Sequence, residues 1–192
     1  MRRYISKGLM RNFIIIFFIV ILGGCSIYPG SYFHPESSIG DVLSTGSCGD
    51  NTPSKLMINS EQVELTTQAR TVQNNGDKTW IWFEAKSKIP FVISASPKDI
   101  IFISNGKIIE PHEIYYSYKK QDSIWLSHDY KTLKDLPKSS GVTNNLLIVF
   151  RLKHYENIQF QINKLIVSGQ PVKNFNIEFK NTKKIRVSAL NC

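Results

Sequence analysis

The feature of this sequence that most constrains its fold is a succession of short apolar segments, in several of which every second residue is polar. Successive side chains of a strand point to opposite faces, so this alternation predicts half-buried β-strands with one solvated face. Continuous apolar segments predict strands that are buried on both faces. The alternating segments are 158–162, 175–179 and 185–189, and the continuous ones are 79–83 and 146–150.

One pair of predicted strands is joined by a recognisable turn. Asn105-Gly106 lies between the apolar segments 100–103 and 108–109. A two-residue type I′ turn needs positive φ at both central residues, which asparagine and glycine adopt most readily. The sequence therefore predicts a β-hairpin across residues 100–109.

Turn-forming residues separate about nine segments of this kind, and helical periodicity is never sustained for more than about two turns. This pattern predicts an all-β chain folded as an antiparallel β-sandwich with an immunoglobulin-like layout, and a β-barrel is the alternative. We expect a single β-sandwich domain over residues 61–192.

Residues 25–60 differ from the rest in composition. They are rich in glycine, proline, serine and asparagine and show no sustained period of two or 3.6 residues. We expect a poorly ordered tether here, with a root-mean-square reach of about 25 Å up to Ser47. The alternative is that Ile39, Val42 and Leu43 pack as an edge strand.

The N-terminus has the layout of a secretory signal peptide over residues 1–24. Four basic residues and no acid precede a continuous apolar segment from Phe13 to Leu22. Ten helical residues span roughly 15 Å, about half the hydrocarbon core of a bilayer, so a permanent membrane-spanning helix is the weaker interpretation.

The segment Leu22-Gly23-Gly24-Cys25 resembles the lipobox of bacterial lipoproteins. The resemblance covers residues 1–25 and implies diacylation of the Cys25 thiol (palmitate-type chains), cleavage before Cys25 and acylation of the new amine. Several acyl chains anchor a protein to a bilayer stably, whereas one binds marginally. In a Gram-negative cell, Ser26 in place of aspartate implies an outer-membrane anchor facing the periplasm. An ordinary signal peptide with an incidental Cys25 is the alternative.

The charge balance excludes some partners. The chain has 24 Lys and Arg against 15 Asp and Glu, and cleavage removes four basic residues, which leaves 20 against 15. The surplus is spread out, and its densest cluster lacks the density of a nucleic-acid footprint. We expect no nucleic-acid partner; mild attraction to anionic lipid or cell-wall polymer is the alternative to a solvated face. The cluster is Lys180, Lys183, Lys184 and Arg186.

Two cysteines remain once Cys25 carries lipid. An even pair in an oxidising compartment favours an intramolecular disulfide between Cys48 and Cys192. The closed loop of about 145 residues would stabilise the fold by at most about 5 kcal/mol in the chain-entropy model. The alternative is that Cys192 pairs with a partner chain.

No motif for catalysis, cofactor binding or metal binding is present. The sequence lacks His-Glu-x-x-His, Gly-x-Ser-x-Gly and a phosphate-binding loop. The pairs His112-Glu113 and His128-Asp129 point to opposite faces of a strand, so neither forms a ligand couple. We therefore expect no enzyme, no cofactor and no metal site.

Aromatic residues are the remaining candidates for a contact surface. Trp80 and Trp82 share one strand face and Trp125 lies on another predicted strand. An exposed tryptophan ladder would stack on sugars, but aromatics of this kind more often fill a sandwich core, which we expect here. The segment with Tyr115, Tyr116 and Tyr118 faces both ways, which places at least one tyrosine near the surface.

These features predict a non-enzymatic, lipid-anchored envelope protein that offers sheet faces or edges to a protein partner as an interaction or assembly subunit. Two rival hypotheses remain. The tryptophans and the positive balance suggest a carbohydrate- or peptidoglycan-binding module. The long predicted loop 129–145 suggests an inhibitor that inserts it into a cleft of another protein.

Overall fold

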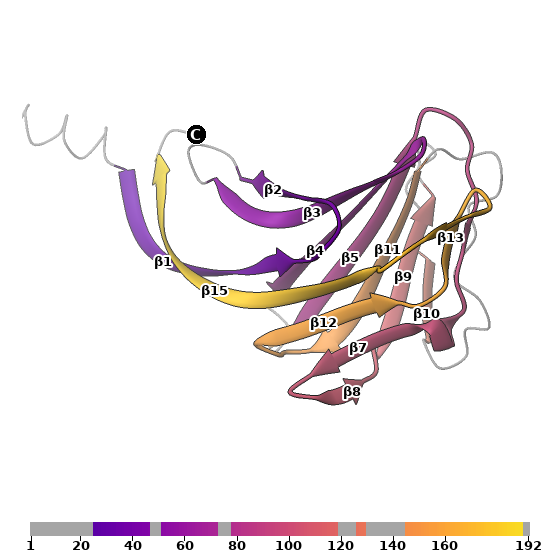
Figure 1. Cartoon of the computed structure of the whole chain (residues 1–192). Helices are drawn as coiled ribbons and strands as arrows, with labels where there is room; N and C mark the ends of the chain where they lie inside the picture. Colours follow the sequence, from indigo (N-terminus) through magenta and orange to yellow (C-terminus); the bar gives the residue numbers. More distant parts are fainter. Residues whose placement is uncertain (1–24, 47–50, 73–77, 119–125, 130–144, 190–192) are drawn as a thin grey trace, which may run out of the picture.

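Two antiparallel sheets face each other across a hydrophobic core (Figure 1). The structure, a computed structural model, describes residues 25–46, 51–72, 78–118, 126–129 and 145–189. Within these residues every sheet is open, with two edge strands, and none closes into a barrel. The predicted fold class, an antiparallel β-sandwich, is confirmed.

The larger layer is a seven-stranded sheet in the order β10-β9-β11-β5-β4-β3-β2. Its centre is β5, which pairs with β4 on one side and β11 on the other. The strands are β2 (Asp41–Thr45), β3 (Thr52–Ser60), β4 (Val63–Val72), β5 (Lys78–Ser87), β9 (Glu113–Tyr118), β10 (Leu126–Asp129) and β11 (Asn145–Lys153).

The opposite layer is a five-stranded sheet in the order β1-β15-β12-β7-β8, and a small sheet β14-β13-β6 lies at one end. A 3-10 turn, Pro97–Asp99, leads into β7. The strands are β1 (Cys25–Glu36), β7 (Ile100–Ser104), β8 (Lys107–Ile109), β12 (Asn157–Ile162), β15 (Asn176–Ala189), β6 (Ile93–Ser94), β13 (Leu165–Val167) and β14 (Gln170–Val172).

Phenylalanine rings from both layers fill the core. The Phe102 and Phe160 rings of the five-stranded sheet are stacked, with centroids 5.0 Å apart. Phe150 of the seven-stranded sheet approaches them at 5.2 Å and 5.6 Å. Phe150 and Phe160 are fully buried, and burying one such side chain contributes about 1.5–3 kcal/mol. This contact holds the two layers together.

The predicted hairpin is present between β7 and β8, where Ser104 pairs with Lys107. Asn105 has φ of 51° and Gly106 has φ of 71°. Both values lie in the left-handed region that a type I′ turn requires. The predicted hairpin is therefore confirmed, together with the positive φ values on which the prediction rested.

The segment that we expected to be a tether is different in the structure. Most of residues 25–60 lies in β1, β2 and β3. β1 pairs over its whole length with β15, and β3 pairs with β4. The alternative prediction of an edge strand agrees better with the structure. Val42 and Leu43 belong to the edge strand β2, and Ile39 packs against the core.

The strand pattern at the C-terminal end also differs from the expectation. Residues 175–179 and 185–189 were predicted as two strands, but β15 runs through both as one strand of 14 residues. The described chain has fifteen strands rather than about nine. The additional ones are β1 to β3 and very short strands such as β13 and β14, whose two or three apolar residues give no periodic signal.

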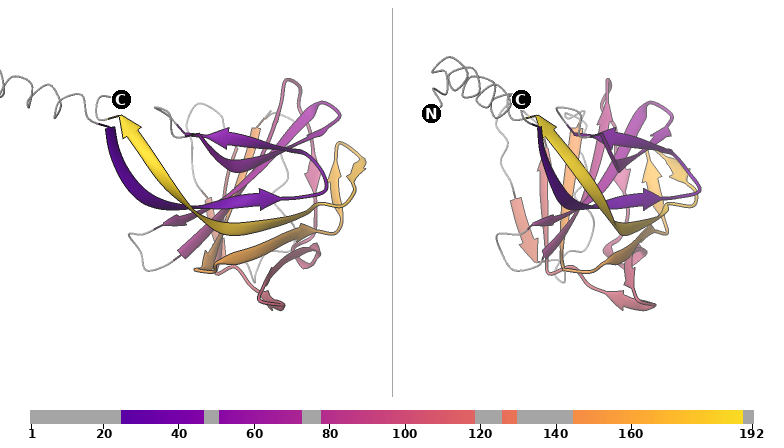
Figure 2. Two further views of the ribbon diagram at one scale, coloured as in Figure 1. Left: turned by 60° about the vertical axis from the view of Figure 1, so that its left-hand side comes forward. Right: turned by 90° about the vertical axis from the view of Figure 1, so that its left-hand side faces the viewer.

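The outer ends of β1 and β15 extend beyond the sandwich as a curved two-stranded ribbon (Figures 1 and 2). The register pairs Cys25 with Ala189 and Tyr32 with Thr182. We call residues 25–32 and 182–189 the ribbon. In the part of the chain that the structure describes, no helix is long and apolar enough to cross a membrane.

Candidate functional site

Trp80 and Trp82 lie on the outer face of the seven-stranded sheet. They alternate along β5 with Ile81 and Phe83, which are fully buried in the core. Both tryptophans are half-buried, so our expectation that they fill the core differs from the structure. Their neighbours across the sheet define a surface that we call the tryptophan face. It consists of Gln68, Arg70, Trp80, Trp82, Glu113, Tyr115 and Arg151.

One row of this face is an ionic network beside Trp80. Arg151 pairs with Trp80 in register, and its guanidinium carbon lies 5.9 Å from the ring centroid. Arg151 Nη1 donates to Glu113 Oε2 at 2.7 Å and to the Tyr115 hydroxyl oxygen at 3.1 Å. The Tyr115 hydroxyl donates to the same carboxylate oxygen at 2.6 Å. The hydrogen bonds therefore join β9 to β11, and the contact between Arg151 and the Trp80 ring joins β11 to β5.

The carboxyl group of Glu113 is held in its charged form. Its pKa is lowered from the ordinary value, first by the hydrogen bond from Tyr115 and then by the one from Arg151. A hydrogen bond to the ionised carboxylate favours that form. The Arg151 side chain is 16% exposed and the Glu113 side chain 42% exposed, so solvent screens the pair only on one side. The network thus persists at neutral pH.

The second row is built around Trp82. Arg70 lies with its guanidinium carbon 5.0 Å from the Trp82 ring centroid. Gln68 pairs with Trp82 in register and is buried. With its carboxamide oxygen directed at Arg70, Gln68 accepts hydrogen bonds from Nε and, at 2.8 Å, from Nη2. The neighbouring amide therefore orients the guanidinium group over the ring.

Three buried donors of the tryptophan face have no acceptor among the described residues. They are the indole N–H groups of Trp80 and Trp82 and the Nε of Arg151. A buried donor without an acceptor costs about 1–3 kcal/mol. Each such group in a folded protein calls for an explanation, and a functional role is one of them.

The outer face of this sheet is basic. Among its charged side chains that the structure describes, six are basic and four are acidic. Glu113 is paired with Arg151, and Glu84 lies 3.0 Å from Lys86. The other basic residues, which make neither of these two ion pairs, lie on the same sheet face as Trp80 and Trp82. The basic residues are Lys55, Arg70, Lys78, Lys86, Arg151 and Lys153, and the acidic ones are Asp41, Glu64, Glu84 and Glu113.

The other candidates from the sequence are distributed differently. Tyr115 is part of the tryptophan face, whereas Tyr116 packs against the core. Tyr118 is the last residue of β9, and Cys25 begins β1. Trp125, both cysteines of the proposed disulfide (Cys48 and Cys192), and residues 130–144 of the predicted loop lie outside the described residues. The disulfide and the loop hypothesis stay predictions.

Arg70, Gln68, Glu113 and Arg151 were not recognised from the sequence. A polar residue inside an apolar strand, such as Arg151 in β11, marks a strand face that is not in the core. That signal was available, but the partner of each residue was not, because cross-strand pairs join residues far apart in the chain. Arg151 and Trp80, for example, are neighbours only through the register of β11 and β5.

A cleft between β1 and the ends of β2, β3 and β4 is a second candidate site. It has a volume of about 620 Å³ and a lining rich in hydroxyl groups. Thr45 and Ser54 are hydrogen-bonded to each other at 2.5 Å between their hydroxyl oxygens. Arg70 and Gln68 also line the cleft, which therefore adjoins the tryptophan face. Its polar groups suit a small polar ligand.

One histidine makes a contact between two strands. His34 Nδ1 lies 3.0 Å from the Pro53 carbonyl oxygen and joins β1 to β3. Among the described residues, no three His, Cys, Asp or Glu side chains gather as metal ligands.

No protein-family model, no curated protein and no solved structure matches this chain.

Proposed function

We propose that this chain is a lipid-anchored envelope protein, acylated at Cys25, that binds a protein partner through the tryptophan face and catalyses no reaction. The observation that carries the binding role is the pairing of Trp80 and Trp82 with Arg151 and Arg70 on an outer sheet face. Tryptophan, tyrosine and arginine are the residues most enriched at the energetic centres of protein interfaces. A Gram-negative outer membrane, facing the periplasm, is the location that the lipobox resemblance and Ser26 favour.

The ring environment argues for a protein partner over a carbohydrate. A sugar that stacks on tryptophan needs an open ring face. Guanidinium groups already lie over Trp82 and Trp80, at 5.0 Å and 5.9 Å from the ring centroids. Glycan binding would have to displace both cations and is therefore the alternative function. The hydroxyl-lined cleft is the observation that keeps this alternative in view.

The edges of the described sheets are poorly suited to adding a strand from another chain. Edge strand β1 contains Pro29 and Pro35, which lack the backbone N–H donor. Edge strand β2 has five residues and a register shift between Leu43 and Ser44, and β8 has three residues. Short, irregular or proline-containing edges resist strand pairing. A face is therefore the better docking surface.

The chemistry of the partner follows from the charge of the face. With six basic against four acidic described side chains, the outer face of the seven-stranded sheet complements an acidic protein surface. Carboxylates of the partner would approach Arg70 and Lys55. We propose an acidic envelope protein as the occupant.

The anchor is tested by Cys25→Ser in the native host. The wild-type protein should fractionate with membranes and carry acyl chains on its N-terminal peptide, whereas the variant should lose both properties. A variant that still sediments with membranes, or a wild-type protein without acylation, would contradict the anchor.

The docking face is tested by photo-crosslinking in intact cells. A photoreactive residue at Lys55 or Lys153 should form a specific protein adduct, and one at Lys107 in the distant β7–β8 hairpin should not. Arg70→Glu should remove the adduct and Lys107→Glu should leave it. An adduct that survives Arg70→Glu, or none at either face position, would contradict the proposed interface.

A further inference from the structure

The ribbon connects the proposed lipid site directly to the folded domain. Cys25 is the first residue of β1 and pairs with Ala189 of β15. Between Cys25 and the buried Phe33 the chain is strand throughout, and each residue has a partner on β15. If Cys25 is acylated, as proposed above, the membrane and the domain are joined by a two-stranded ribbon.

The charge of the ribbon is of one sign. Residues 25–32 and 182–189 contain Lys183, Lys184 and Arg186 and no acid. Acidic residues begin only where the ribbon meets the sandwich, at Glu36 and Glu178, which both pair with Lys180. All charged residues of the segment nearest to the proposed acyl chains are therefore basic.

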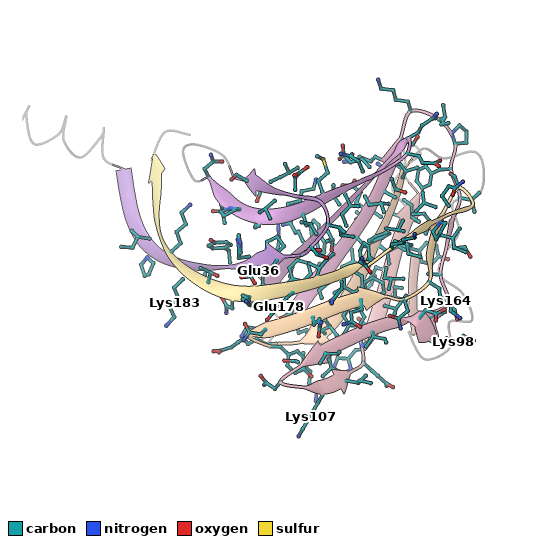
Figure 3. All side chains as sticks on the ribbon, viewed as in Figure 1. Glu36, Lys98, Lys107, Lys164, Glu178 and Lys183 are labelled. Carbon is teal, nitrogen blue, oxygen red and sulfur yellow. The ribbon has the colours of Figure 1, made fainter. Side chains whose placement is uncertain are left out.

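The exposed side chains of the ribbon suit a lipid headgroup region. Ile185 is 69% exposed, and Lys183 is exposed and extends away from the sandwich (Figure 3). Lys184 Nζ donates to the Asn51 carbonyl at 2.5 Å. A hollow of about 410 Å³ is lined by Gly30, Ser31 and the segment 183–185. An ammonium group beside an exposed apolar side chain matches the boundary between phosphate and acyl chain.

We propose that the ribbon lies along the surface of an anionic phospholipid bilayer, with Lys183 and Ile185 in the headgroup region. Ser31, the register partner of Lys183, is six strand residues from Cys25, a distance of roughly 20 Å. Attraction to a charged surface decays within about 8 Å at physiological ionic strength. A ribbon standing upright would leave Lys183 outside this range, and only a ribbon lying along the surface brings Lys183 into it.

The proposal also gives the domain a defined orientation. Because β15 runs from the ribbon into the core, where Phe179 and Ile177 are fully buried, the ribbon cannot swing independently of the sandwich. Lys98 and Lys164 lie at the end of the molecule opposite Lys183 (Figure 3). Lysines at the two ends should therefore differ in their distance from the bilayer.

Lysine footprinting of the full, acylated protein tests this arrangement. The protein is reconstituted in phosphatidylglycerol-containing vesicles or in pure phosphatidylcholine vesicles and treated with a membrane-impermeant amine-reactive reagent. We expect modification of Lys183 to be several-fold slower in the anionic vesicles, with Lys98 and Lys164 as internal controls that do not change. Raising the salt to about 1 M, where the screening length falls to about 3 Å, should restore modification of Lys183.

The outcomes separate this proposal from the proposed function. Vesicle flotation and the mass of the N-terminal peptide report on the anchor in the same samples. Flotation with equal modification of Lys183 in both lipids would overturn the orientation of the ribbon and leave the anchor intact. Absence of acylation and flotation would overturn both. Protection of Lys98 and Lys164 together with Lys183 would also overturn the orientation, because it would show general shielding by the vesicle.

Discussion

The guanidinium carbon of Arg70 lies 5.0 Å from the centroid of the Trp82 ring, on the solvent side of the seven-stranded sheet. The contact presents one flat aromatic group and one cation together on a face that would otherwise be an ordinary polar sheet surface. Buried Gln68 orients the cation by accepting hydrogen bonds from it. The arrangement is the basis of the first prediction.

Arg70→Ala should weaken binding and also lower stability. An exposed cation–π contact contributes about 0.5–1 kcal/mol, and the loss of the hydrogen-bond donor to buried Gln68 costs about 1–3 kcal/mol, so the free energy of unfolding should fall by up to about 4 kcal/mol. Binding of the acidic partner, measured as the yield of the photo-crosslinked adduct, should fall several-fold. The matched control is Lys107→Ala, which removes a cation from the opposite region of the molecule. Equal adduct yields in the two variants would contradict the role of Arg70.

Glu113→Gln should change the acid sensitivity of the fold. The pKa of Glu113 is lowered from its reference value of 4.5, mainly by the Tyr115 hydroxyl and then by Arg151. A carboxyl with a depressed folded-state pKa stabilises the fold above its unfolded pKa, and this stability is lost as pH falls through the folded pKa. The wild type should therefore lose more unfolding free energy below pH 4.5 than the variant does. Urea unfolding at several pH values measures the difference.

Tyr115→Phe provides the companion variant for this test. It keeps the carboxylate and Arg151 but removes the largest cause of the pKa shift. Its acid profile should lie between those of the wild type and Glu113→Gln. Three superimposable profiles would show that the Glu113 network makes no contribution to stability.

Two glycines with positive φ should respond differently to alanine. Gly106 has φ of 71° and open space around the position of a Cβ, so Gly106→Ala should cost about 1 kcal/mol from backbone strain alone. Gly40 has φ of 79°, and a Cβ there would overlap the Met57 carbonyl oxygen and lie 2.7 Å from Ile58 Cγ1. Gly40→Ala should therefore be clearly the more destabilising, as measured by denaturant midpoints. Equal losses of stability in the two variants would mean that the β2–β3 region makes room for the new Cβ atom at no cost in free energy.

Phe160→Ala should disrupt the contact between the two layers. The Phe160 ring is fully buried and touches rings of both sheets. Removing a buried phenylalanine ring costs about 3–5 kcal/mol. Ile108→Ala, at a residue that is 74% exposed, is the control and should change stability by less than about 0.5 kcal/mol. A small effect of Phe160→Ala would show that the core refills the space.

Cys48 and Cys192 should form a disulfide in protein purified from an oxidising compartment. Mass spectrometry of non-reduced peptides should find the two cysteines linked, and reduction should lower the free energy of unfolding by up to about 5 kcal/mol, since the bond closes a loop of about 145 residues. Free thiols at both positions would exclude the bond. A dimer that dissociates on reduction would show that Cys192 pairs with a partner chain.

The sequence was a good guide wherever the signal was local. The alternation at 158–162 and the continuous apolar segment at 146–150 correspond to β12 and β11. Asn105-Gly106 forms the hairpin turn because its φ values are a property of the two residues themselves. These features depend on neighbours within a few positions, which a single sequence displays.

The sequence failed where a strand depends on a distant partner. Composition alone predicted disorder for residues 25–60, but backbone hydrogen bonding with β15 makes β1 a strand although its residues alternate poorly. The pairing joins Cys25 to Ala189, across almost the whole chain. The entropy of closing so long a loop must be offset by the rest of the fold, which no local pattern reveals.

The choice of face was also beyond the sequence. Alternation in β5 showed that Trp80 and Trp82 share a face, but both faces of this strand are rich in large apolar residues. The contact of Phe102, Phe150 and Phe160 selects the other face for the core. The sequence by itself therefore determined the all-β class, the positions of the regular strands and the hairpin turn. Only the tertiary structure decided the ribbon and the tryptophan face, because both are made by pairs of residues that meet through sheet register.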